Sequence, residues 1–331
     1  METIEKRRPG RPRKNKPKKQ IDKQGILEKP SNWDDNNTSV HAVEIVHDNP
    51  VAFKKIFALF HSYMVNPIEA HFQPTQIVLS GRSNRTNNKQ QSSRIKVVIN
   101  GDKMVRYWVE SEFKVSLCLD RFNSVMSSIN KQHSQIILVT TRNNKLSKLW
   151  VSFLDENDIN QSNNTIEVNS QIMPGSEDVI KKINSDLETE SIYPLSFKIT
   201  STCLKSKIGE YSKAHAMKFD IRTDDSTKIG DTVEFSTTSA DGGITKSCRL
   251  GCISKYDYNG YFIAPICKSV IQPLANSLIT DSYNISVHES KDLIITAKIY
   301  DEDEKDKQNG KEQISIYILL DLFYSNDNPS I

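Results

Sequence analysis

Apolar and polar positions follow one order that occurs twice along the chain. Between residues 113 and 155, the pattern predicts a strand, a short helix and then a pair of strands. Apolar residues alternate over 113–119, as in a half-buried strand, and recur at helical spacing over 122–129. The same order returns over 260–300. We therefore expect two similar halves, each built from the same supersecondary unit.

Four helices with apolar stripes are expected, two in each half. Their predicted bounds are 50–64, 120–131, 202–213 and 270–279. Asn49 followed by Pro50 is a typical helix start, and Asp120 is a candidate N-cap for the second helix. Because proline is tolerated only in the first helical turn, Pro273 predicts that the last helix begins near Ile271 or Gln272.

The remaining apolar runs predict strands. They lie at 40–47, 68–72, 76–80, 94–100, 104–110, 165–172, 195–200, 216–222, 232–237, 244–250, 261–266 and 313–319. Residues 173–193 are highly charged, with one short amphipathic helix around Val179 and Ile183. We expect an α+β fold with antiparallel sheets: a disordered tail (1–39), a first domain (40–172), a connector (173–193) and a second domain (194–331).

Charge is distributed unevenly along the 331 residues. The net charge is +3, but residues 6–19 hold nine Lys and Arg and no acidic residue. The rest of the chain holds 35 Lys and Arg against 41 Asp and Glu, a formal charge of −6. If this acidic body binds nucleic acid, it must do so through a localised set of basic side chains.

The basic tail contains a short motif that resembles an AT-hook, a minor-groove binding segment with a Gly-Arg-Pro core. Glycine allows close approach to a narrow groove, proline keeps the backbone extended, and arginine favours the negative potential there. The motif comprises Arg7, Arg8, Gly10, Arg11, Pro12, Arg13 and Lys14, with Pro9 where many hooks carry a further Arg. The alternative is a plain polybasic tail that contacts phosphates without sequence preference.

No motif in the sequence predicts catalysis, a metal site or a cofactor. The five cysteines are scattered and odd in number, which favours reduced thiols in an intracellular protein. The Cys248–Cys252 spacing is not that of a zinc knuckle, and no Walker or dinucleotide-binding loop is present. The N-terminus lacks the apolar region of a signal peptide, and no run of about 18 apolar residues predicts a membrane span. We therefore expect a protein that is not an enzyme.

Basic side chains recur on the polar faces of the predicted helices. A basic face on one helix is ordinarily just solvated, but several such faces in an acidic body favour contact with phosphates. The candidates for contact with duplex DNA are Lys54, Lys55, Arg121, Lys131, Lys205, Lys207, Lys213 and Lys268.

The order of elements resembles the DNA sliding clamps of the proliferating-cell-nuclear-antigen (PCNA) type. The resemblance covers about residues 40–325 and depends on phrases such as FKKIF, FKVSLCLDRFNSVM and QIILVTT. The basic tail and the phrases at 25–30, 48–54 and 193–195 are similar to the clamp-like protein of asfarvirus-type large DNA viruses.

This resemblance implies a homotrimeric ring around duplex DNA that acts as a polymerase processivity factor in replication. The implied partners are DNA polymerase and other replication or repair proteins, at viral replication sites in the host cytoplasm or, alternatively, in the nucleus. Subunits would join by strand 165–172 of one chain against 244–250 of the next. The implied interface residues are Val168, Ile172, Cys248 and Leu250. The alternative is a viral DNA-binding or transcription accessory factor that forms no ring and acts through its tail.

Overall fold

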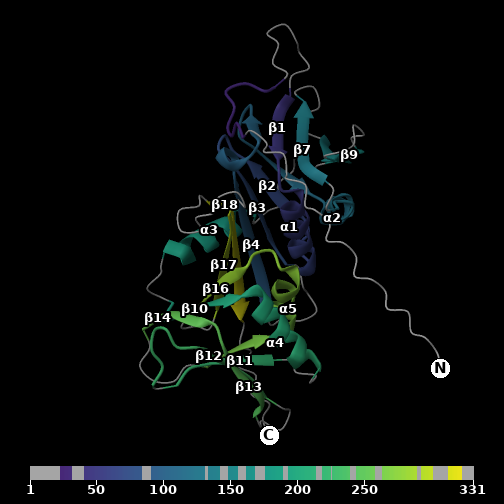
Figure 1. Ribbon diagram of the computed structural model, residues 1–331. Coiled ribbons are helices and arrows are strands. Elements are labelled where there is room, and N and C mark those ends of the chain that lie inside the picture. Colours follow the sequence, from purple (N-terminus) through teal and green to yellow (C-terminus); the bar gives the residue numbers. More distant parts are fainter. Residues whose placement is uncertain are drawn as a thin grey trace, which may run out of the picture.

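The fold consists of two halves with the same order of strands and helices. The computed structural model describes residues 23–31, 41–83, 91–130, 133–141, 148–155, 162–167, 176–188, 193–213, 218–224, 226–238, 244–257, 263–288, 292–300 and 312–322. Within these ranges each half contains nine strands and two α-helices (Figure 1). A fifth α-helix lies between the two halves in the sequence. This arrangement confirms the duplicated unit and the α+β class.

The bounds of the elements follow the predicted order. The first half contains β1 (His41–His47), α1 (Pro50–Ser62), β2 (Ile68–Phe72), β3 (Gln76–Arg82), β4 (Gln91–Asn100), a 3-10 turn η1 (Gly101–Lys103), β5 (Arg106–Val109), β6 (Phe113–Leu117), α2 (Leu119–Ser127), β7 (His133–Thr141), β8 (Lys148–Asp155) and β9 (Ser162–Glu167). After α3 (Ser176–Glu188), the second half contains β10 (Leu195–Thr200), α4 (Ser201–Lys213), β11 (Lys218–Arg222), β12 (Val233–Thr238), β13 (Ile244–Leu250), β14 (Cys252–Tyr256), β15 (Ile263–Cys267), α5 (Lys268–Ser277), β16 (Ser282–Val287), β17 (Leu293–Tyr300) and β18 (Glu312–Leu322).

The described strands form three antiparallel sheets, and the largest joins the two halves. Its nine strands have the order β14-β10-β16-β17-β18-β4-β3-β2-β6. The junction is β18 against β4, with Ile316 opposite Val97 and Ile318 opposite Ile95. The first half also forms the sheet β5-β1-β7-β8-β9, and the second half forms β13-β12-β11-β15. The proposed division into two domains at 173–193 stays a prediction, because this central sheet and its core include both halves.

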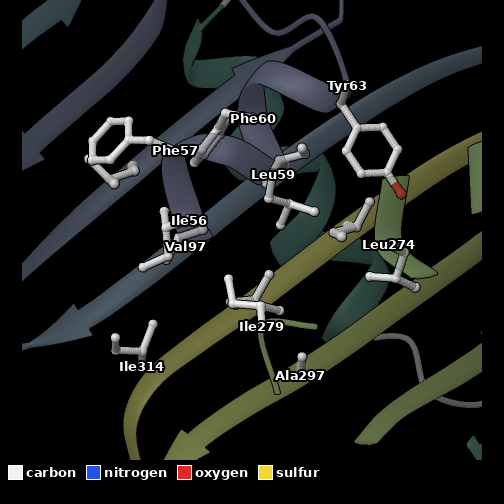
Figure 2. Packing of buried hydrophobic residues seen from close by; sticks show 14 of the residues in the cluster. Ile56, Phe57, Leu59, Phe60, Tyr63, Val97, Leu274, Ile279, Ala297 and Ile314 are labelled. Atoms are coloured by element: carbon white, nitrogen blue, oxygen red, sulfur yellow. The ribbon is translucent and has the colours of Figure 1, made fainter. Parts of the chain in front are cut away.

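Helices cover both faces of the central sheet. On one face, Ile56 and Phe60 of α1 and Leu274 of α5 pack with Val97 and Ile314, as Figure 2 shows. On β18 the side chains alternate, so Ile316 and Ile318 join this core while Leu319 points to the opposite face. There Leu319 packs against Val179 and Ile183 of α3. The layers are therefore α1, α2, α4 and α5 on one side, the sheets between, and α3 on the other side.

Most predicted elements are present, and several boundaries differ. Asn49 caps α1 as predicted, with its side-chain oxygen accepting from the Ala52 N–H at 3.0 Å. In α2 the prediction of Asp120 as N-cap is wrong: the cap is Cys118, which makes no side-chain capping bond, and Asp120 lies in the first turn. There its carboxylate lies near the positive end of the helix dipole.

The start of α5 and one strand were also predicted incorrectly. Helix α5 begins at Lys268 and not near Ile271, so Pro273 lies inside the helix, where it leaves one backbone hydrogen bond unmade. The strand β14 was not predicted, because only Gly251, with φ of 77°, separates it from β13. The strand expected at 165–172 is β9, described over Ser162–Glu167.

Part of the expected tail is ordered. Residues 23–31 lie along β5, and Ile26 forms a parallel bridge with Tyr107. We call residues 23–31 the strap and residues 1–22 the arm. The disorder expected for 1–39 therefore does not hold for the strap, whereas the arm, the AT-hook-like motif and the stretch 32–40 lie outside the described residues.

Candidate nucleic-acid interface

Four helices form one continuous layer. Phe57 of α1 stacks against Phe122 of α2, with ring centroids 4.3 Å apart. Helix α1 also contacts α5, which contacts α4, so the order is α2-α1-α5-α4. Each helix buries an apolar stripe against the sheets, for example Leu204 and Ile208 of α4. The polar side of the layer is therefore a single surface to which both halves contribute.

This layer is basic, although the chain outside residues 6–19 is acidic. The four helices contain seven Lys and Arg residues and two acidic residues, Asp120 and Glu210. Helix α3, on the opposite face of the central sheet, contains four acidic residues and two lysines. The helical layer therefore has a net positive charge, as phosphate binding requires, whereas α3 has a net negative charge.

The two candidate lysines of α1 contact the ends of neighbouring helices. Lys54 Nζ donates to the backbone oxygens of Ser127 at 2.9 Å and Ile129 at 2.7 Å, at the C-terminus of α2. Lys55 Nζ donates to the Leu278 oxygen at 2.7 Å, just beyond α5. Carbonyls at helix C-termini lack intrahelical donors and carry partial negative charge, so both ammonium groups stabilise these ends. Both side chains are half-buried, so they also retain contact with solvent on the polar side.

The candidates on α2 and α4 extend further into solvent. Arg121 and Lys205 are exposed, and Lys207 is half-exposed and forms an ion pair with Glu210 at 3.0 Å. The hydrogen bond and charge of Glu210 raise the pKa of Lys207, and Cys248 and Cys203 contribute weakly in the same direction. Lys207 therefore keeps its positive charge.

For the three remaining candidates, the structure gives at most a position along a helix. Lys213 is the last residue of α4 and Lys268 the first residue of α5, so both lie at ends of helices in the basic layer. Lys131 lies outside the described residues, as do all seven residues of the AT-hook-like motif. Contact of these side chains with DNA stays a prediction.

Within the described ranges, β9 and β13 are edge strands, one in each half. Strand β9 ends the five-stranded sheet and lies against α2, whereas β13 ends the four-stranded sheet of the half that contains α4. Among the implied interface residues, Cys248 is partly buried and Leu250 is buried in the main core. An interface at β13 would therefore involve the backbone of Leu250 and not its side chain. Val168 and Ile172 lie outside the described residues.

The strap was not identified as a structural element from the sequence. Ser31 donates to the buried Glu44 through its N–H at 2.9 Å and its hydroxyl at 2.6 Å, and Arg106 lies 3.1 Å from the same carboxylate. Lys23 pairs with Asp48 at 3.2 Å. The signal that could have indicated order is the apolar pair Ile26 and Leu27 next to Gly25, within an otherwise polar stretch.

Helix α3 is held on its face of the sheet by a small cluster of its own. Val179 and Ile183 pack with Tyr193, Ile294 and Leu319. Beside them, Lys96 Nζ donates to Asn184 Oδ1 at 2.6 Å and lies 5.3 Å from the centre of the Tyr317 ring. Burial lowers the pKa of Lys96. The amphipathic helix predicted within the connector is therefore confirmed, and it covers an apolar patch of the sheet.

Other kinds of site have little support in the described ranges. No group of three or more His, Cys, Asp and Glu residues is placed there to hold a metal ion. Among the helices that the structure describes, none is long and apolar enough to cross a membrane. The basic helical layer and the open strand edges are thus the features on which a function can be based.

Two halves of nine strands and two helices, with sheets outside a basic helical layer, define the fold of the PCNA-type sliding clamps. Two solved structures share this fold. The PCNA2–PCNA3 complex of Sulfolobus tokodaii gives a TM-score of 0.60 and 16% identity over 84% of this chain and 98% of the other. PCNA of Entamoeba histolytica gives 0.60 and 12% identity over 86% of this chain and all of the other.

In sequence, the chain is similar to an uncharacterized protein of African swine fever virus. The two are 23% identical over 294 residues, which cover 88% of this chain and 93% of the relative. The same viral protein from further isolates matches equally well. No protein-family model matches the sequence. The predicted resemblance to PCNA-type clamps and to an asfarvirus protein is thus confirmed.

Proposed function

We propose that this chain is a viral DNA sliding clamp that assembles into a homotrimeric ring around duplex DNA. In this role the ring tethers a DNA polymerase and other replication or repair proteins to the template. The helical layer lines the hole and the arm supplies additional DNA contacts. A tether needs no catalytic residues, which agrees with the absence of any catalytic motif in the sequence.

The observation that carries this proposal concerns the two strands that pair at the junction within the chain. The strand equivalent to each of them, in the other half, lies at the edge of a sheet. Strand β18 is the ninth strand of the second half, and it pairs with β4, the fourth strand of the first half. Among the edge strands of the described sheets are β9, the ninth strand of the first half, and β13, the fourth strand of the second half. Pairing β9 of one chain with β13 of the next would therefore repeat the internal junction and give another nine-stranded sheet.

The helices support the same assembly. At the internal junction, α1 of the first half meets α5 of the second half. The equivalent helices α2 and α4 lie at the two ends of the layer, where α2 contacts β9 of its own half. A head-to-tail contact of this kind closes into a ring when its rotation completes a circle. The same contact would also remove two exposed strand edges, which natural proteins tend to cover.

The charge distribution supports DNA as the molecule inside the ring. A basic layer without groove-reading elements suits contacts with phosphates, which hold DNA without selecting a sequence. A closed ring on such contacts stays on DNA by topology and can still move along it. We extend the proposal to replication sites in the cytoplasm of the host, because the relatives that match in sequence are viral proteins.

The experiment combines native mass with retention on DNA of different topology. We expect a particle of three times the 37.7 kDa chain mass. Once loaded, it should stay on circular duplex at high salt and leave linear duplex with free ends. A monomer that binds linear and circular DNA equally would contradict the ring. That result would favour the alternative of an accessory factor that acts through the arm.

A further inference from the structure

The strap extends the sheet of the first half by backbone pairing alongside β5. The N–H groups of Gln24, Gly25 and Leu27 donate to the oxygens of Val105, Met104 and Tyr107 at 2.9, 3.2 and 2.8 Å. In return, the Tyr107 N–H donates to the Gly25 oxygen at 2.9 Å. The edge of β5 that faces away from β1 is therefore covered by the chain's own N-terminal segment.

Side chains fix both ends of the strap. At its C-terminal end, Ser31 supplies two hydrogen bonds to Glu44, whose carboxylate is buried. At its N-terminal end, Lys23 pairs with Asp48. Gly25 between them has φ of 65°, and a Cβ there would lie 3.0 Å from the Asp102 oxygen. The path of the strap therefore requires glycine at this position.

The strap determines where the basic arm is attached to the folded body. Asp48 directly precedes Asn49, the N-cap of α1, so Lys23 lies beside the start of the basic helical layer. The basic run ends at Lys19, four residues before Lys23. A fully extended chain spans at most ~3.6 Å per residue, so the four-residue tether that ends at Lys23 can span at most about 14 Å. By the same limit, a ten-residue tether can span at most about 36 Å.

We propose that the strap holds the basic arm at the edge of the helical layer, so that the arm and the layer bind the phosphates of the same duplex. This inference rests on the proposed function, because it assumes that the helical layer faces DNA. Two phosphate-binding elements joined by a short tether act at a high effective concentration relative to each other. The strap is thus a positioning element for DNA capture.

The size of the effect follows from the length of the tether. With the strap in place, the tether from Arg13, in the middle of the basic run, to its anchor at Lys23 contains ten residues. Without it, the nearest described anchor is His41 at the start of β1, 28 residues from Arg13. Effective concentration falls roughly as the −3/2 power of tether length, so detachment of the strap should weaken DNA capture about fivefold.

Two insertions in the full-length chain test this proposal. One places about eighteen Gly and Ser residues between residues 22 and 23, before the strap, which lengthens the tether as much as strap detachment would. The other places the same segment between residues 35 and 36, after the strap. Affinity for a short linear duplex, measured by fluorescence anisotropy at fixed salt, should fall about fivefold for the first insertion and stay unchanged for the second.

A substitution of the strap itself provides an independent measurement. Gly25→Val should detach the strap, and hydrogen exchange at the Tyr107 amide should accelerate because its acceptor is lost. The matched control is Ile26→Ala, which changes a side chain that is 43% exposed and leaves the backbone pairing intact. We expect Gly25→Val to weaken DNA binding as the first insertion does, and Ile26→Ala to bind like the unchanged chain.

The outcomes separate this inference from the proposed function. Arg121→Ala combined with Lys205→Ala removes exposed charge from the helical layer and should weaken binding. In that background, the first insertion should have a smaller effect than it has in the unchanged chain. Suppose that the double variant weakens DNA binding, but the two insertions change the affinity equally or not at all. The strap then does not position the arm. If the double variant binds DNA like the unchanged chain, the helical layer does not face DNA, and the proposed function fails together with this inference.

Discussion

Two adjacent lysines on α1 connect three helices of the basic layer. Lys54 contacts the C-terminus of α2, and Lys55 contacts the residue that follows α5. The second contact crosses between the halves of the chain, since α5 belongs to the second half. These side chains therefore contribute to the packing of the layer as well as to its charge.

Replacement of Lys54 by methionine tests this structural contribution. Lys54→Met keeps the apolar stem and removes two hydrogen bonds from a charged donor, so we expect the free energy of unfolding to fall by about 1 kcal/mol, after allowance for partial exposure. Urea denaturation measures this change. Lys205→Met, at an exposed position of α4, is the control and should leave stability within about 0.5 kcal/mol. Equal stability of both variants would mean that Lys54 acts only as a surface charge.

The contacts of Lys54 and Lys55 could be predicted only in part from residue types and spacing. The helical periodicity places Lys54 and Lys55 beside the apolar stripe of α1, and the polar face is apparent from the sequence. Their acceptors lie 73 to 223 positions away, so the contacts depend on how the helices pack. The bonds of Ser31 to Glu44 were not predictable for the same reason. The Asn49 cap was predictable because capping is local, with its acceptor and donor three residues apart.

At the scale of elements, α3 forms a unit that is packed separately from the main core. Its buried residues Val179 and Ile183 contact a cluster that is distinct from the one beneath α1 and α5. The helix could be predicted because its apolar residues have helical spacing. Which face of the sheet it covers could not be predicted, because that depends on the alternation of side chains along β17 and β18.

A charged residue in this cluster should release α3 without unfolding the body. Ile183 is fully buried, so Ile183→Asp places a carboxylate in an apolar contact and should cost about 3 kcal/mol or more for docking of the helix. We expect faster proteolytic cleavage within 176–188, measured by limited digestion, with little change in the main thermal transition. Lys182→Asp, on the exposed side of the same helix, should be cleaved like the unchanged chain. Cooperative loss of the whole fold in Ile183→Asp would show that the two clusters are energetically one.

At the scale of the whole molecule, the two halves are equivalent in construction but not in environment. The junction of β18 with β4 is satisfied within the chain, whereas β9 and β13 are edges in the part of the chain that the structure describes. The duplication was visible in the sequence as a repeated pattern. The sequence did not show which strand edges are paired within the chain and which are open. A strand has the same hydrophobic alternation whether or not a neighbour covers its edge.

Proline at consecutive positions of β13 should distinguish pairing within the chain from pairing between chains. Consecutive N–H groups of a strand point to opposite sides, so one of Ser247→Pro and Cys248→Pro removes a donor to β12 and the other removes a donor at the open edge. We expect one variant to have a lower melting temperature. The other should keep its fold, seen as an unchanged circular dichroism spectrum, but should have the native mass of a monomer. If both variants remain trimeric, β13 does not join the subunits.

The pairing of β18 with β4 also has a consequence for synthesis of the chain on the ribosome. Ile95 and its partner Ile318 are 223 positions apart. At roughly 5–20 residues per second, β4 is translated about 10 to 45 s before the strand that covers it. During this interval β4 has an uncovered edge, and the face that contains Ile95, Val97 and Ile99 lacks part of its core. Uncovered strand edges and exposed apolar side chains promote aggregation of nascent chains and binding by chaperones. Truncation before Glu312 should therefore extend this exposure indefinitely and make the first half insoluble, although no residue of that half is changed.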